Sequence, residues 1–367
     1  MTISKFTSVH QLALNKHCLG DHFNKIFSVQ EHQAVCRGTP ELLAKYGSPI
    51  DNVQHLISIR NKITSDLVWF NRERVKKPQQ FVSSGNTPAQ SDGVASCDFC
   101  SWDTMTAQDT FGRIEGKYCV TGSNLFKYVA PYQAVCSFKN HDPLQFTLEA
   151  LCDVFQVSSR WFRACAQDYG CVDDLHPMIL WNANSRSGAS QYHGHTQLLY
   201  SSEPFPQQDV MLHHILPSYP GDYYADFMKA HADVGLSRQV TGGATIFASV
   251  APYKDRDIWV RGESIEDYGF QFLVYCGLRT IIDCLDSSSF NIGVYPQGPS
   301  SSLLSGGPSG SGGVVCRIVS RGRHGSKSLA SDYGGLEVFS NASIGHTDPF
   351  DVMEAFDAYR ATLDIQM

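Results

Sequence analysis

The chain has 367 residues with a formal net charge of −7 at pH 7, and 42% of the residues are hydrophobic. This length accommodates two or three domains with buried cores, and no long basic stretch favours nucleic acid or an anionic membrane as a partner. The N-terminus lacks the continuous apolar core of a secretory signal, and no apolar run approaches the roughly 18 residues of a membrane span. The 12 cysteines are scattered rather than spaced like a disulfide scaffold, so we expect a cytoplasmic protein.

Along the chain, composition and apolar periodicity predict four parts. These are an N-terminal segment, a first α+β unit, a connection and a second unit, at residues 1–96, 97–205, 206–240 and 241–367. Residues 83–96 are typical of a loop, and a short helix is expected around Tyr224–Ala232. The Gly/Ser/Pro-rich stretch Gln297–Gly313 is predicted to be a long hairpin loop or, alternatively, a lid.

An internal repeat links the two units. Phe126-Lys-Tyr-Val-Ala-Pro-Tyr132 recurs as Phe247-Ala-Ser-Val-Ala-Pro-Tyr253. Each copy is followed by a helical pattern, a strand-like run, a Gly/Ser-rich turn and a second strand-like run. The runs are Leu144–Tyr169, Met178–Trp181 and Thr196–Tyr200 in the first copy, and Ile265–Leu285, Phe290–Tyr295 and Val314–Val319 in the second. We therefore predict two copies of one α+β unit, packed closely or sharing one sheet.

Cys97-Asp-Phe-Cys100 provides two thiols at the spacing of a zinc knuckle, which requires two further nitrogen or sulfur ligands. Taken alone, the pair could equally be a redox pair or two buried thiols. His141, before a helical pattern, and His193 are the candidate partners, because one ion would then explain four residues at once. Such a site has no open position, so we expect the zinc to be structural.

His193-Gly-His195-Thr-Gln197 is the motif that most constrains function. A His-x-His pair on an extended backbone places both side chains on one side, and the Gly/Ser-rich turn upstream lets amide N–H groups approach an anion closely. A neutral imidazole is a good nucleophile toward a negatively charged phosphoryl centre near pH 7. The second repeat has Val314–Val319 where the first has this motif, so only the first half is expected to keep the chemistry.

Together, the block Asn182–Gln197, the Cys-x-x-Cys pair, the lone histidine before a helix and the repeat resemble the galactose-1-phosphate uridylyltransferase branch of the histidine-triad superfamily. The resemblance runs from about Asp66 to near the C-terminus. It implies an α+β fold of two fused histidine-triad-like halves, each an antiparallel sheet with packed helices, of which the second is degenerate. It also implies a homodimer, because the family's sites are commonly completed by a partner subunit.

Residue by residue, the resemblance implies that His195 attacks the α-phosphorus of a nucleotide and that Gln197 binds a non-bridging phosphate oxygen. His193 becomes a zinc ligand with Cys97, Cys100 and His141. The implied substrate-binding residues are Arg74, Lys77, Asn124, Phe126, Asn182, Gly188, Ser190 and Glu337, the last supplied to the His195 site of the partner chain. Gly194 stands where uridylyltransferases usually have proline, and Leu336 where an aromatic residue commonly precedes the glutamate, so the identity of the sugar does not carry over.

These features predict a zinc-containing nucleotidyltransferase or phosphorylase. A nucleoside monophosphate would pass from a nucleotide sugar to a sugar 1-phosphate or phosphate through a nucleotidyl-His195 intermediate. Gln197 in place of a third histidine withholds an acid from the leaving group, which a phosphate leaving group does not need. Two alternatives stay open: a dinucleoside-polyphosphate phosphorylase, and a nucleotide-binding protein that has lost turnover.

Overall fold

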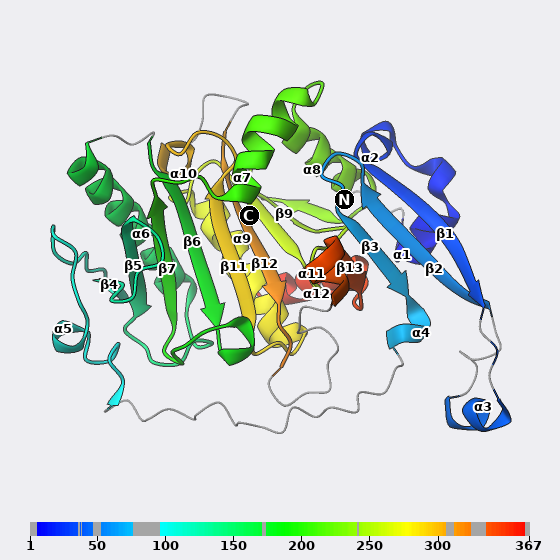
Figure 1. The fold of residues 1–367 in the computed structure, drawn as a ribbon, viewed down its shortest axis with the longest axis horizontal. Helices are drawn as coiled ribbons and strands as arrows, with labels where there is room; N and C mark the ends of the chain where they lie inside the picture. The colour runs from blue at the N-terminus through cyan, green and yellow to red at the C-terminus, as the bar shows by residue number, and fades with distance from the viewer. Residues whose placement is uncertain are drawn as a thin grey trace.

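The computed structural model describes residues 6–35, 37, 39–46, 53–75, 96–170, 174–240, 242–305, 312–323 and 335–363. Its strands form one nine-stranded and one four-stranded sheet, which lie side by side (Figure 1). The predicted α+β fold of two fused halves is confirmed. Among the described helices, none is long and apolar enough to cross a membrane.

The nine-stranded sheet contains both halves of the repeat. Its order is β4 (Cys119–Ser123), β5 (Pro131–Phe138), β7 (His195–Ser201), β6 (His176–Ala183), β11 (Phe290–Pro296), β12 (Val314–Ser320), β10 (Ile258–Gly262), β9 (Thr245–Ala248) and β8 (Ser237–Gln239). Neighbours pair antiparallel throughout, and the halves join where β6 pairs with β11, with Trp181 opposite Ile292. The two copies of the repeat peptide lie in corresponding hairpins, β4–β5 and β9–β10, where the first copy extends into β5 and the second begins in β9.

Each half has a helix that precedes its strand at the junction, between β5 and β6 in the first half and between β10 and β11 in the second. In the first half this helix is α6 (Leu148–Tyr169), where the Thr147 side chain accepts a hydrogen bond from the Ala150 N–H and Gly170 ends the helix at φ 87°. In the second half it is α9 (Tyr268–Arg279), which begins at Asp267 and continues as a π-helical turn, η6 (Thr280–Cys284). The two helices contact each other, and α12 (Pro349–Ala361) packs against α9 and β9.

The sheet has a covered back and a more open front. In β6, Ile179 and Trp181 are buried while Leu180 and Asn182 are half-exposed, as alternation along a strand requires. In the second half, α8 (Tyr223–Asp233) covers the front, because Phe227 of α8 contacts Phe247 and Trp259. In the first half, the accessible face of the sheet is therefore its front. The strand β6 on this face leads to the turn that contains His193-Gly-His195.

The N-terminal residues form the four-stranded sheet, of order β1 (Phe27–Val35), β2 (Val53–Asn61), β3 (Leu67–Asn71) and β13 (Ala342–Gly345). β13 comes from the other end of the chain and pairs parallel with β3, with Ala342 opposite Leu67. The helices of this region are α1 (Val9–Leu14), α2 (Asp21–Ile26), α3 (Pro40–Tyr46) and α4 (Arg72–Val75). The four-part division along the chain stays a prediction, but its first and last parts share this sheet.

The connections hold the remaining short elements. The predicted helix at Tyr224–Ala232 is α8, and before it come α7 (Pro206–Val210), a π-helical turn η4 (Met211–Ile215) and a 3₁₀ turn η5 (Leu216–Ser218). Of the stretch Gln297–Gly313, residues 297–305 and 312–313 are described, with a short helix α10 (Ser302–Ser305). Most of the predicted loop 83–96 lies outside the described residues.

Candidate active site

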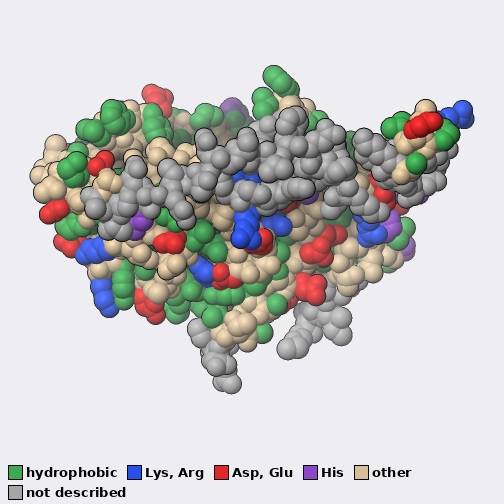
Figure 2. All heavy atoms as spheres, turned by 90° about the horizontal axis from the view of Figure 1, so that it is seen from below, with side chains coloured by type: hydrophobic (Ala, Val, Ile, Leu, Met, Phe, Trp, Pro, Cys, Tyr) green, Lys and Arg blue, Asp and Glu red, His purple; other side chains and the backbone are tan. Residues whose placement is uncertain are grey.

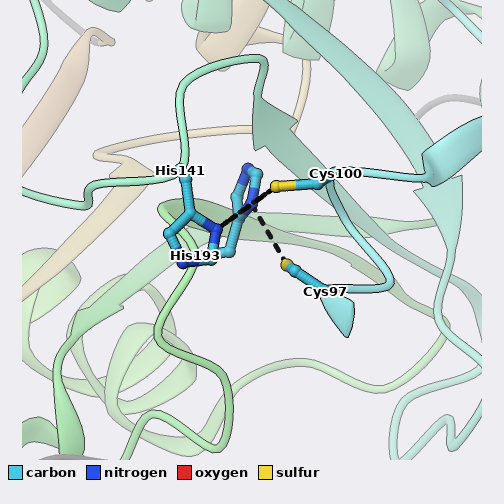
Figure 3. Close-up of side chains that lie close together, drawn as sticks. All are labelled: Cys97, Cys100, His141 and His193. Carbon is cyan, nitrogen blue, oxygen red and sulfur yellow. Dashed lines mark hydrogen bonds between the residues drawn. The ribbon is translucent and has the colours of Figure 1, made fainter. Parts of the chain in front are cut away.

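The two thiols of the Cys97–Cys100 knuckle face the Nδ1 atoms of two histidines (Figure 3). The Cys97 Sγ lies 3.4 Å from the His193 Nδ1, and the Cys100 Sγ lies 3.3 Å from the His141 Nδ1 and 3.4 Å from that of His193. The two Nδ1 atoms are 3.3 Å apart. All four ligand atoms lie within 4.8 Å of one another. The fold thus brings together the four residues that the sequence nominated for a metal.

These separations fit a tetrahedral zinc ion. With Zn–S bonds of about 2.3 Å and Zn–N bonds of about 2.0–2.1 Å, the edges of a tetrahedron run from roughly 3.3 Å between nitrogens to 3.8 Å between sulfurs. The observed nitrogen–nitrogen and nitrogen–sulfur separations of 3.3–3.4 Å lie at the short end of that range. Burial, followed by the neighbouring Cys97, raises the pKa of Cys100 to about 11, so the thiol would ionise at neutral pH only beside a cation.

The backbone holds the His193 imidazole in the orientation that a metal needs. The Nε2–H of His193 donates to the Phe138 carbonyl at 2.6 Å, which leaves the Nδ1 lone pair facing the thiols. Burial lowers the pKa of His193 to about 4, so the ring is neutral at pH 7. Gly194 donates its N–H to the His141 carbonyl at 3.3 Å. Proline at this position has no N–H and could not make that bond.

His195 is buried at the start of β7, with 5% of its surface exposed. Its Nδ1 lies 2.8 Å from the His193 carbonyl oxygen, and a carbonyl can only accept, so Nδ1 carries the proton and Nε2 has a free lone pair. Burial lowers the pKa of His195, which keeps the ring neutral near pH 7. Phe99, between the two cysteines, packs against His195 with ring centroids 5.0 Å apart. His195 therefore contacts the backbone of His193 and the ring of Phe99 in the Cys97–Cys100 knuckle.

Gln197 lies two residues further along β7. Its Oε1 accepts from the Asn124 Nδ2 at 3.1 Å and from the Gln133 Nε2 at 3.2 Å. Asn124 follows β4 and its Oδ1 accepts the Phe126 N–H, so the hairpin that carries Phe126 is tied to Gln197 through one side chain. Phe126 itself is 83% exposed. The sequence nominated Asn124, Phe126 and Gln197, and they lie in one hydrogen-bonded group.

The turn after β6 supplies the other nominated residues of this half. A 3₁₀ turn, η3 (Ser185–Ser187), ends at Gly188, whose φ of 87° is the left-handed conformation that glycine adopts without strain. Gly188 and Ser190 are exposed, as a phosphate-binding turn requires. The Asn182 Oδ1 accepts from the Asn291 Nδ2 at 2.7 Å, and the same Nδ2 lies 2.9 Å from the Ser187 carbonyl. The second half thus supports the turn of the first.

This turn projects from the lower edge of the sheet in Figure 1. Figure 2 views the molecule from that side, where Lys and Arg side chains gather near the middle, beside Asp and Glu side chains. Arg186 of the turn donates to the Arg323 carbonyl at 2.8 Å, and Arg323 pairs with Asp286 at 2.9 Å. The Arg186 guanidinium of the turn therefore contacts the backbone of the second half.

Three residues that the sequence predicted for substrate binding are not placed beside His195 in this chain. Glu337 is in α11 (Gly335–Ser340), which packs against β13, and its carboxylate lies 3.6 Å from the Lys254 Nζ. Figure 1 shows α11 beyond β12, away from β7 in the same chain. Arg74 is in α4, and its side chain is not described. Lys77 lies outside the described residues.

A cavity of about 820 Å³ lies at the other end of β6, where His176 and Pro177 contribute to its lining. Aromatic side chains contribute to its wall, among them Tyr224 and Phe227 of α8 and Trp259 and Tyr295 of the second half. Cys97, Cys100, His141 and His193 do not line it, nor do His195 and Gln197. We therefore place the candidate phosphate chemistry at His195 and not in this cavity.

Sequence reasoning did not find Phe99, Gln133 and Asn291. Gln133 could have been noticed in the sequence, since it is the only amide in the mostly apolar strand β5, where it is fully buried. Asn291 is likewise a polar residue inside the predicted strand-like run Phe290–Tyr295. Phe99 lay inside the knuckle, but nothing in the spacing showed which way its ring would point.

We compared the sequence and the fold with those of known proteins. No family model and no curated protein matches the sequence. By structure, an ADP-glucose phosphorylase from Arabidopsis thaliana with bound ADP-glucose matches 85% of this chain and 100% of its own, with a TM-score of 0.62 and 15% identity. A uridylyltransferase matches 83% of this chain and 98% of its own, with a TM-score of 0.57 and 10% identity. A GalT-like protein from Arabidopsis thaliana matches 71% and 91%, with a TM-score of 0.50 and 15% identity.

The chain has the fold of the uridylyltransferase-like proteins. The resemblance predicted from the His193–Gln197 motif and the repeat is confirmed at the level of the fold. The ADP-glucose phosphorylase and the uridylyltransferase each match more than four fifths of this chain, so the likeness includes the second half as well as the half with His195.

Proposed function

We propose that this chain is a metal-containing nucleotidyltransferase or phosphorylase that works through a nucleotidyl-His195 intermediate. The observation that carries the proposal is the state of His195. Its Nδ1–H is held by the His193 carbonyl, so a neutral ring presents a lone pair on Nε2 beside the Gln197 amide. That is the arrangement of an activated nucleophile next to a group that can bind a phosphate oxygen.

In the first step, the Nε2 of His195 attacks the α-phosphorus of the donor. A P–N bond forms, and the bond from that phosphorus to the bridging oxygen breaks. The leaving phosphate keeps the electron pair and needs no proton from the enzyme, which agrees with Gln197 rather than an acid at this place. In the second step, a phosphate oxygen of the acceptor attacks the same phosphorus and breaks the P–N bond. One difficult displacement is thereby divided into two easier ones.

The residues around His195 would hold the nucleotide. Gln197 and Ser190 would bind the phosphate oxygens, where charge builds up in the transition state. Gly188, whose N–H donates to the Ser185 carbonyl at 3.0 Å, would let the phosphate approach the turn closely. Phe126 and Asn124 on the β4–β5 hairpin would contact the nucleoside. Asn182, Arg74 and Lys77 are proposed phosphate-binding residues on the evidence of the motifs.

The cluster Cys97, Cys100, His141 and His193 would hold zinc, which when bound supplies a fixed tetrahedral junction and no reactive position. The residues around the cluster would then hold the His195 ring in place. The His193 carbonyl holds the proton on the Nδ1 of His195, and Phe99 packs on the ring. Both contacts fix the direction in which Nε2 points.

For the donor we propose a nucleoside-diphosphate sugar, and for the acceptor a sugar 1-phosphate or inorganic phosphate. Similarity in fold to a protein with bound ADP-glucose supports this class of donor. The base is contacted by the β4–β5 hairpin, where Phe126 is exposed and able to stack on any base, so the proposal extends to the class of nucleotide sugar and not to one base.

Steady-state kinetics test this mechanism. Because the first product must leave before the second substrate binds, double-reciprocal plots at several fixed acceptor concentrations are expected to be parallel. The measurement is initial velocity with both substrates varied. Intersecting lines would mean that donor and acceptor are bound together, and the two-step mechanism would be abandoned.

We further propose that the active form is a homodimer in which Glu337 of one chain completes the His195 site of its partner. Exposed apolar side chains on both surfaces support this. Phe126 on the β4–β5 hairpin is 83% exposed, and Phe339 and Val338 on α11 are 90% and 58% exposed. Contact between the hairpin and α11 of a second copy would bury these residues, and two-fold symmetry would produce the same contact twice.

Complementation of two inactive variants tests the shared site. His195→Ala and Glu337→Gln chains are each expected to be nearly inactive alone. If co-expressed at equal levels, half of the dimers pair one chain of each kind and contain one intact site of two, which gives about a quarter of wild-type activity. Light scattering provides the mass of the same sample. A fully active monomer, or a mixture without activity, would contradict the shared site.

A further inference from the structure

The hydrogen bonds around Gln197 fix which way its side-chain amide points. Backbone N–H groups can only donate. The Phe126 N–H lies 2.8 Å from one terminal atom of Asn124, and the Tyr128 N–H lies 2.8 Å from one terminal atom of Gln133. Those atoms must therefore be oxygens, so the other terminal atom of Asn124 and of Gln133 is an NH₂ group.

Both of these NH₂ groups converge on one atom of Gln197. The Asn124 Nδ2 lies 3.1 Å from it and the Gln133 Nε2 lies 3.2 Å from it. Two donors require an acceptor, so that atom is the Gln197 carbonyl oxygen. The NH₂ group of Gln197 must then point away from the pair, on the front face that it shares with His195.

Gln133 is the more deeply placed of the two donors. It lies within β5 with no exposed surface, whereas Asn124 is half-exposed after β4. The Gln133 Oε1 also accepts from a second backbone group, the Val129 N–H, at 3.2 Å. A fully buried amide that uses both of its ends has one orientation, because reversing it would leave the Tyr128 and Val129 N–H groups without an acceptor and would place two oxygens against each other.

We propose that Gln133 is a positioning residue for the transfer reaction: it holds the Gln197 amide with its NH₂ toward the phosphate and couples that orientation to the hairpin that carries Phe126. This inference rests on the proposed function. Without the Gln133 NH₂, only the half-exposed Asn124 would hold the Gln197 oxygen, and the Gln197 amide could turn by 180° and present a carbonyl oxygen to a negatively charged phosphate. Without the Gln133 oxygen, the hairpin N–H groups of Tyr128 and Val129 would lose their acceptor.

Two substitutions separate the two ends of Gln133. Gln133→Glu keeps an oxygen for the hairpin N–H groups but places a second acceptor against the Gln197 oxygen, so Gln197 is expected to reverse. Gln133→Met keeps the length of the side chain and removes both contacts. For Gln133→Glu we expect kcat to fall by roughly 10- to 10²-fold with KM for the donor little changed, the scale for losing one donor to a developing oxyanion. For Gln133→Met we expect KM to rise as well.

A double-mutant cycle and a matched control separate positioning from general damage. Gln197→Ala alone is expected to slow adduct formation by roughly 10²-fold. In that background, Gln133→Glu should cost less than a further twofold, because the group it positions is already gone. Gln271→Met makes the same chemical change at a buried glutamine of α9 whose Nε2 donates to the Ile265 carbonyl, and it should leave kcat unchanged. Additive losses, or an equal effect of Gln271→Met, would overturn the inference.

A readout without substrate distinguishes failure of this inference from failure of the proposed function. In ¹⁵N-labelled protein, the side-chain NH₂ protons of Gln133 should be protected from solvent exchange and those of Gln197 should exchange readily. In Gln133→Glu, the Gln197 protons should become protected because they now face the new carboxylate. Unchanged exchange of the Gln197 protons in Gln133→Glu would contradict the positioning role, whether or not the wild-type chain forms a nucleotidyl adduct.

Discussion

Replacing His195 by alanine is expected to abolish nucleotidyl transfer, with a fall in kcat of roughly 10⁴-fold or more, because no other group would then form the covalent intermediate. The effect should be on chemistry and not on folding, since the side chain makes one hydrogen bond, to the His193 carbonyl. The measurement is the transfer rate with saturating donor, together with a thermal melt of the same sample.

Chemical rescue makes this prediction specific. His195→Gly leaves a space of about the size of the lost ring, and added imidazole should restore part of the transfer in proportion to its concentration. His213→Ala is a suitable control, because this exposed histidine pairs with Asp209 at 3.6 Å and lies outside the candidate site. Near-normal turnover in His195→Ala would exclude a covalent role for this residue.

Loss of the metal-binding cluster is expected to produce the second large effect. Wild-type protein should contain about one zinc per chain, and the Cys97→Ser/His141→Ala double variant should contain almost none. Because structural zinc contributes free energy of folding directly, the variant should melt at a much lower temperature or fail to fold. The measurements are elemental analysis of the purified protein and thermal unfolding with and without a chelator.

A cysteine outside the cluster provides the control. Cys284 is exposed at the end of the π-helical turn after α9, so Cys284→Ser should keep both the metal and the melting temperature. Full zinc content in the Cys97→Ser/His141→Ala variant would refute the ligand assignment. A chain purified without zinc but with unchanged stability would refute the structural role of the metal.

The parts of this molecule that sequence predicted are those in which neighbours in the chain are also neighbours in space. β6, its turn and β7 follow one another in the chain. The residues from Asn182 to Gln197 therefore lie in one hairpin, and their proximity could be predicted from the sequence. The two halves were predictable because the apolar pattern of α6, β6 and β7 recurs in α9, β11 and β12. Apolar periodicity indicates a helix or a strand without information about the elements against which it packs.

What sequence did not predict depends on contacts between distant segments. β13 pairs with β3 across most of the chain, so the four-stranded sheet could not be derived from periodicity. Gln133 donates a hydrogen bond to Gln197, which is 64 positions away, and Asn291 donates one to Asn182, which is 109 positions away. Glu337 was placed by resemblance alone, and its ion pair with Lys254 in the same chain gave no local signal. The sequence contained one indication of such contacts, namely polar residues within mostly apolar strands.

The most direct test of the account is the mass of the intact protein after mixing with donor alone. Wild-type chain incubated with a panel of nucleoside-diphosphate sugars, without acceptor, should gain the mass of one nucleoside monophosphate. The adduct should be labile to acid and stable to base, as a phosphoramidate is, and peptide mapping should locate it on His195. An unmodified mass in a preparation that converts donor and acceptor to products, or an adduct on another residue, would contradict the nucleotidyl-His195 mechanism.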